Sequence, residues 1–250
     1  MSDGLDADLA SVAALGEPVR RELYRYVVAQ DGPVGREQAA GSVGVAHHVA
    51  KFHLDRLVAD GLLEVEYSRP PGRGGPGAGR PAKRYRRAAR DIAVSLPERR
   101  YDLAGRVLAE AVTVAARDGV PVTAALRRAA RDAGRRLAAD AAADPAAGPG
   151  AGGADPVAAV GAILAGGGYE PRADAAGIVL ANCPFHSLAQ AYTDLVCGMN
   201  LHLIGGLLDA LGTGGLCARL DPGPGRCCVT VGPAGGGPDG PVEAAAAGPA

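Results

Sequence analysis

All five cysteines of this 250-residue chain lie in the stretch from Ala181 to Val231. They are Cys183, Cys197, Cys217, Cys227 and Cys228. Thiols that gather in one short region indicate a site for sulfur chemistry, whereas thiols used only as small apolar groups would be scattered through the core. The region must therefore fold so that several of these residues meet, and this constrains the fold more than any other sequence feature.

The spacing of the first two cysteines requires a break in the helical pattern. An unbroken helix from Cys183 to Leu211 would separate Cys183 and Cys197 by about 20 Å, which is farther than a metal ion or cluster can span. Thr193 or Asp194 can cap a new helix that begins around Leu195. Cys197 would then lie in the first turn, where the helix dipole favours a thiolate.

Cys227 and Cys228 are neighbours in a predicted closing strand. Successive strand residues point to opposite faces, so normally only one of the two can join a site with Cys183 and Cys197. A turn at Gly223-Pro224-Gly225 could relax this rule. Cys217 is expected to be a packed thiol, and the candidates for a fourth ligand are Cys228 and His186.

Three cysteines from three elements, without a CxxC pair, fit more than one chemistry. A structural zinc would take four nitrogen or sulfur ligands. An iron–sulfur cluster would be held by thiolates, with a fourth ligand of another kind or from outside the chain. A thiol redox switch without metal is the third possibility, and the spacing alone leaves all three open.

Length and composition limit the number of domains and the cellular compartment that we expect. A chain of 250 residues with a formal net charge of −1 has room for one large domain or two small ones. We find no apolar run of about 20 residues and no signal peptide in MSDGLDADLA, so we expect a cytoplasmic protein without a membrane partner. In that reducing compartment, clustered cysteines indicate metal or redox use.

The first 92 residues predict a winged helix-turn-helix domain. Helical patterns over residues 5–30, 35–40 and 45–60 are followed by an alternating strand at 62–67 and a basic loop. His47, His48 and Lys51 stand near the start of the third helix, where side chains reach base edges in the major groove. His53 is either packed, in contact with phosphate or a base reader.

The loop after the strand is rich in cations and contains no acidic residue over positions 68–90. Such a run suits DNA phosphates or entry into a minor groove, and double-stranded operator DNA is the expected partner. The alternative is a solvated Gly/Pro linker. The expected wing contacts are Arg69, Arg73, Arg80, Lys83, Arg84 and Arg86.

The remaining chain predicts a sensor domain reached through two helices. Residues 93–142 form linking helices, at 98–117 and 121–142, that either dimerise or pack within the chain. Residues 143–155 are expected to be a flexible loop, 156–232 the cysteine-containing sensor domain with a small sheet, and 233–250 a disordered tail. The predicted fold class is α+β, mainly α.

Both halves resemble known regulators. LGEPVRRELYRYV, HHVAKFHLDRLVADGLLEVE and GRPAKRYR resemble winged-helix repressors of the ArsR/DeoR type. CPFHSLAQAYTDLVCGMNLHLIGGLLDALG and ARLDPGPGRCCVTV resemble the sensor half of the Suf-operon repressors, which carry an iron–sulfur cluster. This resemblance implies a homodimeric repressor of cluster-assembly genes that holds a [2Fe–2S] or [4Fe–4S] cluster through Cys183, Cys197 and Cys227.

A weaker resemblance supports an alternative to the iron–sulfur repressor. The helix–strand–Cys ending is similar to small-molecule-binding domains of the vinyl-reductase type, which can hold zinc. It implies a regulator with structural zinc and an effector bound near the 195–211 helix. We find no phosphate loop, nucleophile elbow or carboxylate pair in an informative place, so the sequence does not predict an enzyme.

Overall fold

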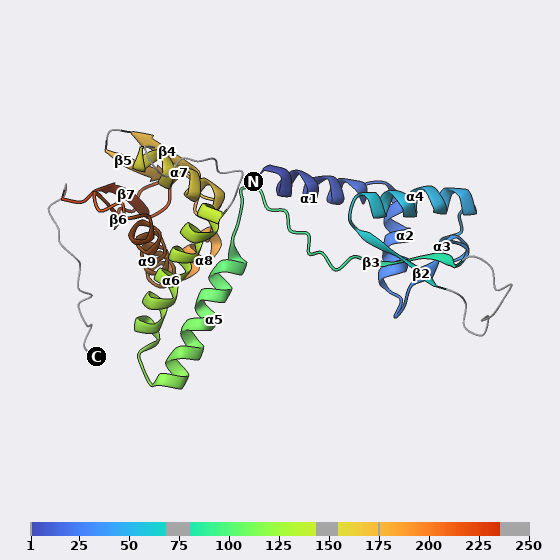
Figure 1. Cartoon of the computed structure of the whole chain (residues 1–250), viewed down its shortest axis with the longest axis horizontal. Helices are drawn as coiled ribbons and strands as arrows, with labels where there is room; N and C mark the ends of the chain where they lie inside the picture. Colours follow the sequence, from blue (N-terminus) through green and yellow to red (C-terminus); the bar gives the residue numbers. More distant parts are fainter. Residues whose placement is uncertain (1, 69–80, 144–154, 175, 236–250) are drawn as a thin grey trace. The chain divides into compact units, whose positions relative to one another are not determined.

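The computed structural model describes residues 2–68, 81–143, 155–174 and 176–235 (Figure 1). The chain divides into two compact units, Met1–Val94 and Ser95–Ala250. Both combine helices with a small antiparallel sheet, so the prediction of a mainly helical α+β chain is confirmed.

The N-terminal unit contains four helices and three strands within its described residues. They are α1 (Ser2–Ala14), α2 (Pro18–Val28), β1 (Val34–Gly35), α3 (Arg36–Val43), α4 (His47–Ala59), β2 (Leu63–Ser68) and β3 (Ala82–Arg87). The strands pair antiparallel in the order β1-β3-β2. Strand β1 is not among the predicted elements, because a two-residue strand has no periodic pattern.

Local chemistry explains where these helices begin and end. The Glu17 carboxylate accepts hydrogen bonds from the backbone N–H groups of Val19 and Arg20, and Pro18 occupies the first helical position of α2. Gly44 ends α3 with a φ of 74°, a conformation that glycine adopts without strain. Large side chains then fill the core, with Leu23, Leu54 and Tyr85 fully buried.

The C-terminal unit contains five helices and four strands within its described residues. They are α5 (Tyr101–Asp118), α6 (Val122–Ala143), α7 (Pro156–Gly166), β4 (Pro171–Asp174), β5 (Gly177–Leu180), α8 (His186–Ala191), α9 (Thr193–Leu211), β6 (Leu216–Leu220) and β7 (Val229–Pro233). The sheet is antiparallel throughout, in the order β4-β5-β7-β6.

Helices α6 and α9 lie side by side and approach so closely that glycine is required at the contact (Figure 1). A Cβ atom on Gly134 of α6 would lie 1.9 Å from the Leu203 carbonyl oxygen, and one on Gly206 of α9 would lie 2.1 Å from the Arg131 carbonyl oxygen. No real side chain fits at such distances. The two glycines therefore set the position of α9 against α6.

The linking helices predicted for residues 93–142 are part of the core of the C-terminal unit. Ala104, Val107 and Ala111 of α5 and Ala129 and Ala130 of α6 are buried in the same cluster as α9. A separate linking segment is therefore not observed, because the small residues on these helices let them pack closely within the unit. The expected loop at 143–155 and tail at 233–250 lie mostly outside the described residues, and β7 extends to Pro233.

Helix α9 is the one helix within the described ranges that is long and apolar enough to cross a membrane by length and composition. Half of the apolar window is buried inside the unit, and the buried residues include Leu203, Ile204 and Leu207. Its apolar character is accounted for by its packing as a core helix.

Candidate functional site

Four of the five cysteines meet at the end of α9 that lies nearest its N-terminus. Cys183 follows β5, Cys197 belongs to α9, and Cys227 and Cys228 precede β7. Cys197 and Cys228 form a disulfide with a Cα–Cα distance of 6.4 Å. Cys183 and Cys227 are buried free thiols joined by a hydrogen bond. We call these four residues the sulfur site.

The predicted helix break is present, two residues earlier than expected. Helix α8 ends at Ala191 and α9 begins at Thr193, so Cys197 is in the second turn of α9 and not in the first. The Thr193 hydroxyl donates to the Ala189 carbonyl oxygen at 2.8 Å and does not cap α9. The break allows Cys183 and Cys197 to lie closer together than one continuous helix would. The effect of the helix dipole on the Cys197 thiol is weaker than predicted, because that effect fades beyond the first turn.

The prediction that Cys227 and Cys228 lie on a strand is wrong. Strand β7 begins at Val229, and both cysteines lie in the preceding loop, which turns at Gly225 with a φ of 68°. The alternation of strand side chains therefore does not apply to them. Cys227 contacts Cys183 while Cys228 bonds to Cys197, so these neighbouring residues belong to two different sulfur pairs.

Buried polar groups surround the two free thiols. The Asn200 amide nitrogen donates to the Cys227 Sγ at 3.3 Å, and the Tyr169 hydroxyl donates to the Asn200 Oδ1. On the other side, Arg99 donates to the Cys183 carbonyl oxygen at 2.8 Å and to the Asn182 Oδ1 at 2.5 Å. The guanidinium group of Arg99 therefore helps to fix the position of the backbone at Cys183.

The pKa values of the two thiols are shifted in opposite directions. The hydrogen bond from Cys227, the N–H of Phe185 and the charge of Arg99 lower the pKa of Cys183 to about 7, although burial opposes this. The hydrogen bond to Cys183 and burial both raise the pKa of Cys227. Burial also raises the pKa of the Tyr169 hydroxyl.

The remaining sulfur and the candidate histidine lie apart from this arrangement. Cys217 is on β6 opposite Gly232, three residues from Leu220, which pairs with Val229, so it is about 10 Å along the strand from the loop of Cys228. Its Sγ is 3.9 Å from the Pro233 carbonyl oxygen. His186 is exposed at the start of α8. Of the two candidates for a fourth ligand, Cys228 is bonded to Cys197, and His186 is exposed with its backbone N–H donating to the Cys183 carbonyl oxygen at 3.1 Å.

The arrangement of these cysteines in the structure is not that of a metal site. In the described part of the chain, no group of three or more His, Cys, Asp or Glu residues is arranged to hold a metal ion. Cys197 and Cys228 are bonded to each other and cannot act as thiolate ligands in this state.

In the N-terminal unit, α4 exposes three of the predicted DNA-contacting residues, His47, His48 and Lys51. Phe52, which the sequence analysis omitted, is 64% exposed beside them. It lies outside the stripe of Leu54 and Leu57 that packs into the core, and this pattern could have identified it. His53 is a packed residue, because its Nδ1 is 3.5 Å from the Glu17 carboxylate and its side chain is 13% exposed.

The cations on β3 that are predicted to contact DNA have polar partners within the unit. Lys83 and the Tyr85 hydroxyl both donate to Asp55, and Arg36 donates to the Tyr85 hydroxyl at 2.8 Å. Arg86 pairs with Glu64 at 2.9 Å.

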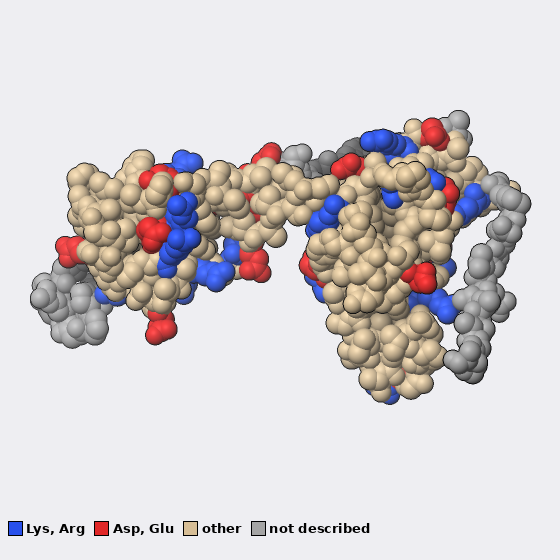
Figure 2. All heavy atoms as spheres, turned by 180° about the vertical axis from the view of Figure 1, so that it is seen from behind, with Lys and Arg blue, Asp and Glu red and all other residues tan. Residues whose placement is uncertain are grey.

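Arg84 donates to the Pro33 carbonyl oxygen at 3.2 Å and stands opposite Glu66 in the β2–β3 register. In the view of Figure 2, acidic side chains lie beside the basic ones on this unit. The loop itself is acid-free, but the acidic residues that pair with its return strand come from α4 and β2. Arg69, Arg73 and Arg80 lie outside the described residues.

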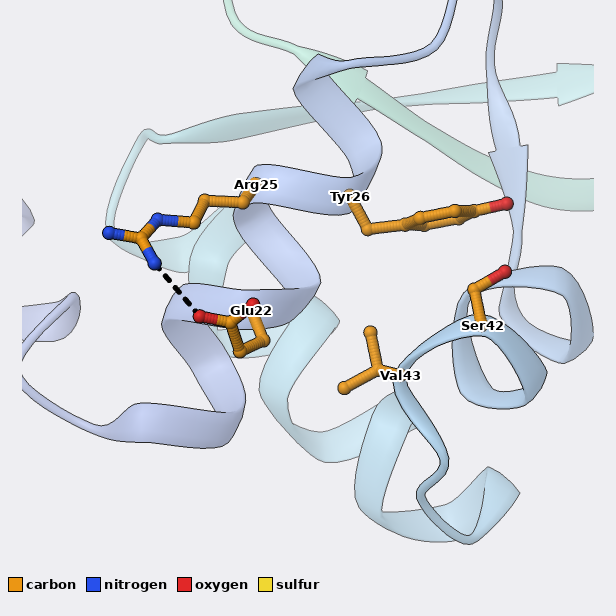
Figure 3. A pocket seen from close by; sticks show the side chains of 5 residues that line it. All are labelled: Glu22, Arg25, Tyr26, Ser42 and Val43. Atoms are coloured by element: carbon orange, nitrogen blue, oxygen red, sulfur yellow. Dashed lines mark hydrogen bonds and ion pairs between the residues drawn. The ribbon is translucent and has the colours of Figure 1, made fainter.

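The N-terminal unit has two shallow depressions on its described surface. The larger, of about 400 Å³, lies between α2 and α3 (Figure 3). Arg25 and Glu22 pair with each other at one side of it, and the Tyr26 ring and Ser42 hydroxyl lie at the other. Neither depression touches α9, where the alternative reading places an effector.

A comparison with known proteins gives no family for this arrangement: no family model, no curated protein and no solved structure matches the chain.

Proposed function

We propose that this protein is a DNA-binding transcriptional repressor whose C-terminal unit senses iron–sulfur cluster or thiol redox status. The observation that carries the proposal is the pairing of four cysteines from three segments of the chain, Cys197 with Cys228 in a disulfide and Cys183 with Cys227 through a hydrogen bond. Sulfurs so arranged can exist as a disulfide with two thiols or as four ligands, which are states that a sensor can distinguish.

The element order of the N-terminal unit supports the DNA-binding half of the proposal. Helices α2, α3 and α4 followed by the paired strands β2 and β3 occur in the order of a winged helix-turn-helix. In that fold α4 is the recognition helix. His48, Lys51 and Phe52 are exposed on it, and an aromatic ring can contact a thymine methyl group while a lysine contacts phosphate or guanine.

The four paired cysteines support the part of the proposal that concerns the iron–sulfur cluster. Cys183, Cys197, Cys227 and Cys228 would hold the cluster, which when bound supplies an oxidant-sensitive redox centre. The disulfide observed here corresponds to an oxidised state that cannot hold it. We further propose that the protein acts as a cytoplasmic homodimer at cluster-assembly genes, with DNA binding lost when the cluster is lost. No catalytic role is proposed.

The first experiment is the visible spectrum of protein purified without oxygen, with analysis of iron, sulfide and zinc. A brown protein with iron and sulfide that bleaches in air is expected. Cys227→Ser should abolish the colour, while Cys217→Ser should retain it, because Cys217 lies outside the sulfur site. A colourless protein with one zinc per chain would overturn the cluster and leave a structural-zinc regulator.

The DNA-binding half is tested separately, by measuring the affinity of the coloured protein for duplex DNA from upstream of its own gene at several salt concentrations. Lys51→Ala should weaken binding and reduce the slope of log K against log salt by about 1. Arg106→Ala is the charge-matched control, because this exposed arginine of α5 lies in the other unit and pairs with Asp102 on its own helix. Equal losses in both variants would contradict the role of α4.

A further inference from the structure

Two free thiols of the C-terminal unit, Cys183 and Cys227, meet beside the ends of two paired strands. Cys183 follows β5 and Cys227 precedes β7, and these strands pair antiparallel at Ile178 and Val231. The Cys227 backbone N–H donates to the Leu180 carbonyl oxygen at 2.8 Å, which holds the loop before β7 against the end of β5. The Cys227 thiol donates to the Cys183 sulfur. We call this pair the buried dithiol.

The two sulfurs of the buried dithiol are not shielded equally. Cys183 is 8% exposed and Cys227 is 1% exposed. A bulky oxidant such as glutathione disulfide needs an open approach to the sulfur that it reacts with, and exchange depends on that access. Hydrogen peroxide has only two heavy atoms and needs much less room. Burial therefore selects for a small oxidant, and such an oxidant reaches Cys183 first.

The surroundings of Cys183 suit it to react first. Its sulfur accepts hydrogen bonds from the Cys227 thiol and from the Phe185 backbone N–H, and the charge of Arg99 acts on it as well. All three favour the thiolate, which is the nucleophile in thiol oxidation. The Cys227 sulfur accepts the Asn200 amide N–H at 3.3 Å, while its own hydrogen is directed to Cys183.

We propose that the buried dithiol reacts with peroxide, so that a small hydroperoxide converts Cys183 and Cys227 into a second disulfide beside that of Cys197 and Cys228. The proposal rests on the redox-sensing function proposed above and deepens it, because it names the pair that responds and the class of oxidant. With both pairs bonded, none of the four cysteines of the sulfur site retains a free thiol.

The reaction takes place in two steps. In the first, the Cys183 thiolate attacks an oxygen of the hydroperoxide, the O–O bond breaks, and the leaving oxygen takes up a proton, which leaves a sulfenic acid on Cys183. In the second, the Cys227 sulfur attacks the Cys183 sulfur, the S–O bond breaks, and hydroxide leaves with the Cys227 proton as water. Two electrons pass from the two thiols to the hydroperoxide, and one S–S bond forms.

The test uses the full-length protein with the Cys197–Cys228 disulfide formed and hydrogen peroxide as the probe. After a brief exposure the protein is denatured, alkylated and mapped by mass spectrometry. The three free thiols should fall to one, Cys217, with a chain about 2 Da lighter and a peptide that links Cys183 to Cys227. Glutathione disulfide at the same concentration should leave all three thiols free.

Three variants assign the role of each sulfur. Cys227→Ser keeps a hydrogen-bond donor beside Cys183 but removes the second sulfur, so peroxide should leave a sulfenic acid on Cys183 that a 1,3-diketone captures. In Cys183→Ser, the peroxide-dependent loss of the Cys227 thiol should be about 10-fold slower or more, because the nucleophile is absent. Cys217→Ser is the control and should form the second disulfide at the wild-type rate, since Cys217 lies apart from the pair.

The wild-type peptide map decides the proposal without any variant. Three free thiols after peroxide treatment, or loss of Cys217 before Cys183, would overturn it. A bond from Cys183 to Cys197 or Cys228 would also overturn it, because that product arises by exchange with the existing disulfide. The affinity of the peroxide-treated protein for DNA is measured separately. A second disulfide that leaves this affinity unchanged would support the reactive dithiol and contradict the redox-sensing function.

Discussion

The N-terminal unit displays polar side chains on the surface of a core of large aliphatic residues, whereas the C-terminal unit buries sulfur and amide groups among helices built largely from alanine and glycine. In the first unit, the candidate contacts on α4 are exposed and can meet a partner directly. In the second, Cys183, Cys227 and Asn200 are buried, so only electrons, protons or small ions and molecules can reach them without a change in structure.

This difference affects how each unit tolerates change. Side chains exposed on α4 can vary without disturbing a core held by Leu54 and Leu57. The sulfur site depends on the position of α9, and that position depends on glycines whose replacement leaves no room. Glycine substitution, reduction and acidification should therefore affect the two units differently.

The largest effect is expected for Gly206→Ala. The new Cβ would lie 2.1 Å from the Arg131 carbonyl oxygen, so α6 and α9 must separate, at a cost of roughly 3 kcal/mol or more. Denaturant unfolding should show loss of stability in the C-terminal unit alone. Gly205→Ala is the matched control, because nothing lies within 4 Å of its Cβ position, and alanine favours the helix by roughly 0.5–1 kcal/mol. Equal destabilisation by both substitutions would contradict the close crossing.

Reduction of the disulfide should have the next largest effect. Cys197 and Cys228 are 31 residues apart, and the loop they close stabilises the C-terminal unit by about 3–4 kcal/mol on the chain-entropy account. Denatured oxidised protein should show three reactive thiols, since Cys183, Cys217 and Cys227 are free. Reduced protein should show all five cysteines of the chain.

Cys197→Ser provides the control for that measurement. The variant should show four thiols with or without reductant, because Cys228 is released. Thiol counts are obtained by quantitative alkylation and mass spectrometry. Five thiols in the oxidised wild type would show that the pairing does not form.

The smallest effect concerns pH and the N-terminal unit. Although burial opposes it, hydrogen bonds from Lys83 and Tyr85 hold the pKa of Asp55 below its ordinary value. A depressed carboxyl pKa contributes stability that is present above the unfolded value of about 3.9 and is lost as pH falls through the folded value. The free energy of unfolding of this unit should therefore decline below about pH 4, and less steeply in Asp55→Asn.

The comparison for Asp55 is Asp31→Asn, an exposed carboxylate on the turn after α2. It removes the same charge without touching Lys83 or Tyr85. Unfolding curves collected from pH 7 to pH 2 measure both variants. An identical acid dependence in Asp55→Asn and the wild type would show that the Asp55 cluster contributes no pH-dependent stability.

Much of the architecture could be predicted from the sequence because it follows from local signals. Pro18 begins α2 and Gly44 ends α3, as the turn and capping preferences of these residues dictate. The apolar periods of 45–60 and 98–117 locate α4 and α5 to within a few residues. The clustering of cysteines likewise identified the region of the sulfur site.

The tertiary structure decided which side chains meet at the sulfur site. Whether Cys228 or His186 completes the set depends on the loop before β7, whose turn at Gly225 releases both Cys227 and Cys228 from strand alternation. The engagement of Lys83 by Asp55 and the approach of Asn200 to Cys227 join residues 28 and 27 positions apart. Composition and periodicity describe a residue and its near neighbours, whereas contacts of this kind are set by how whole helices pack, and here by two glycines at the crossing of α6 and α9.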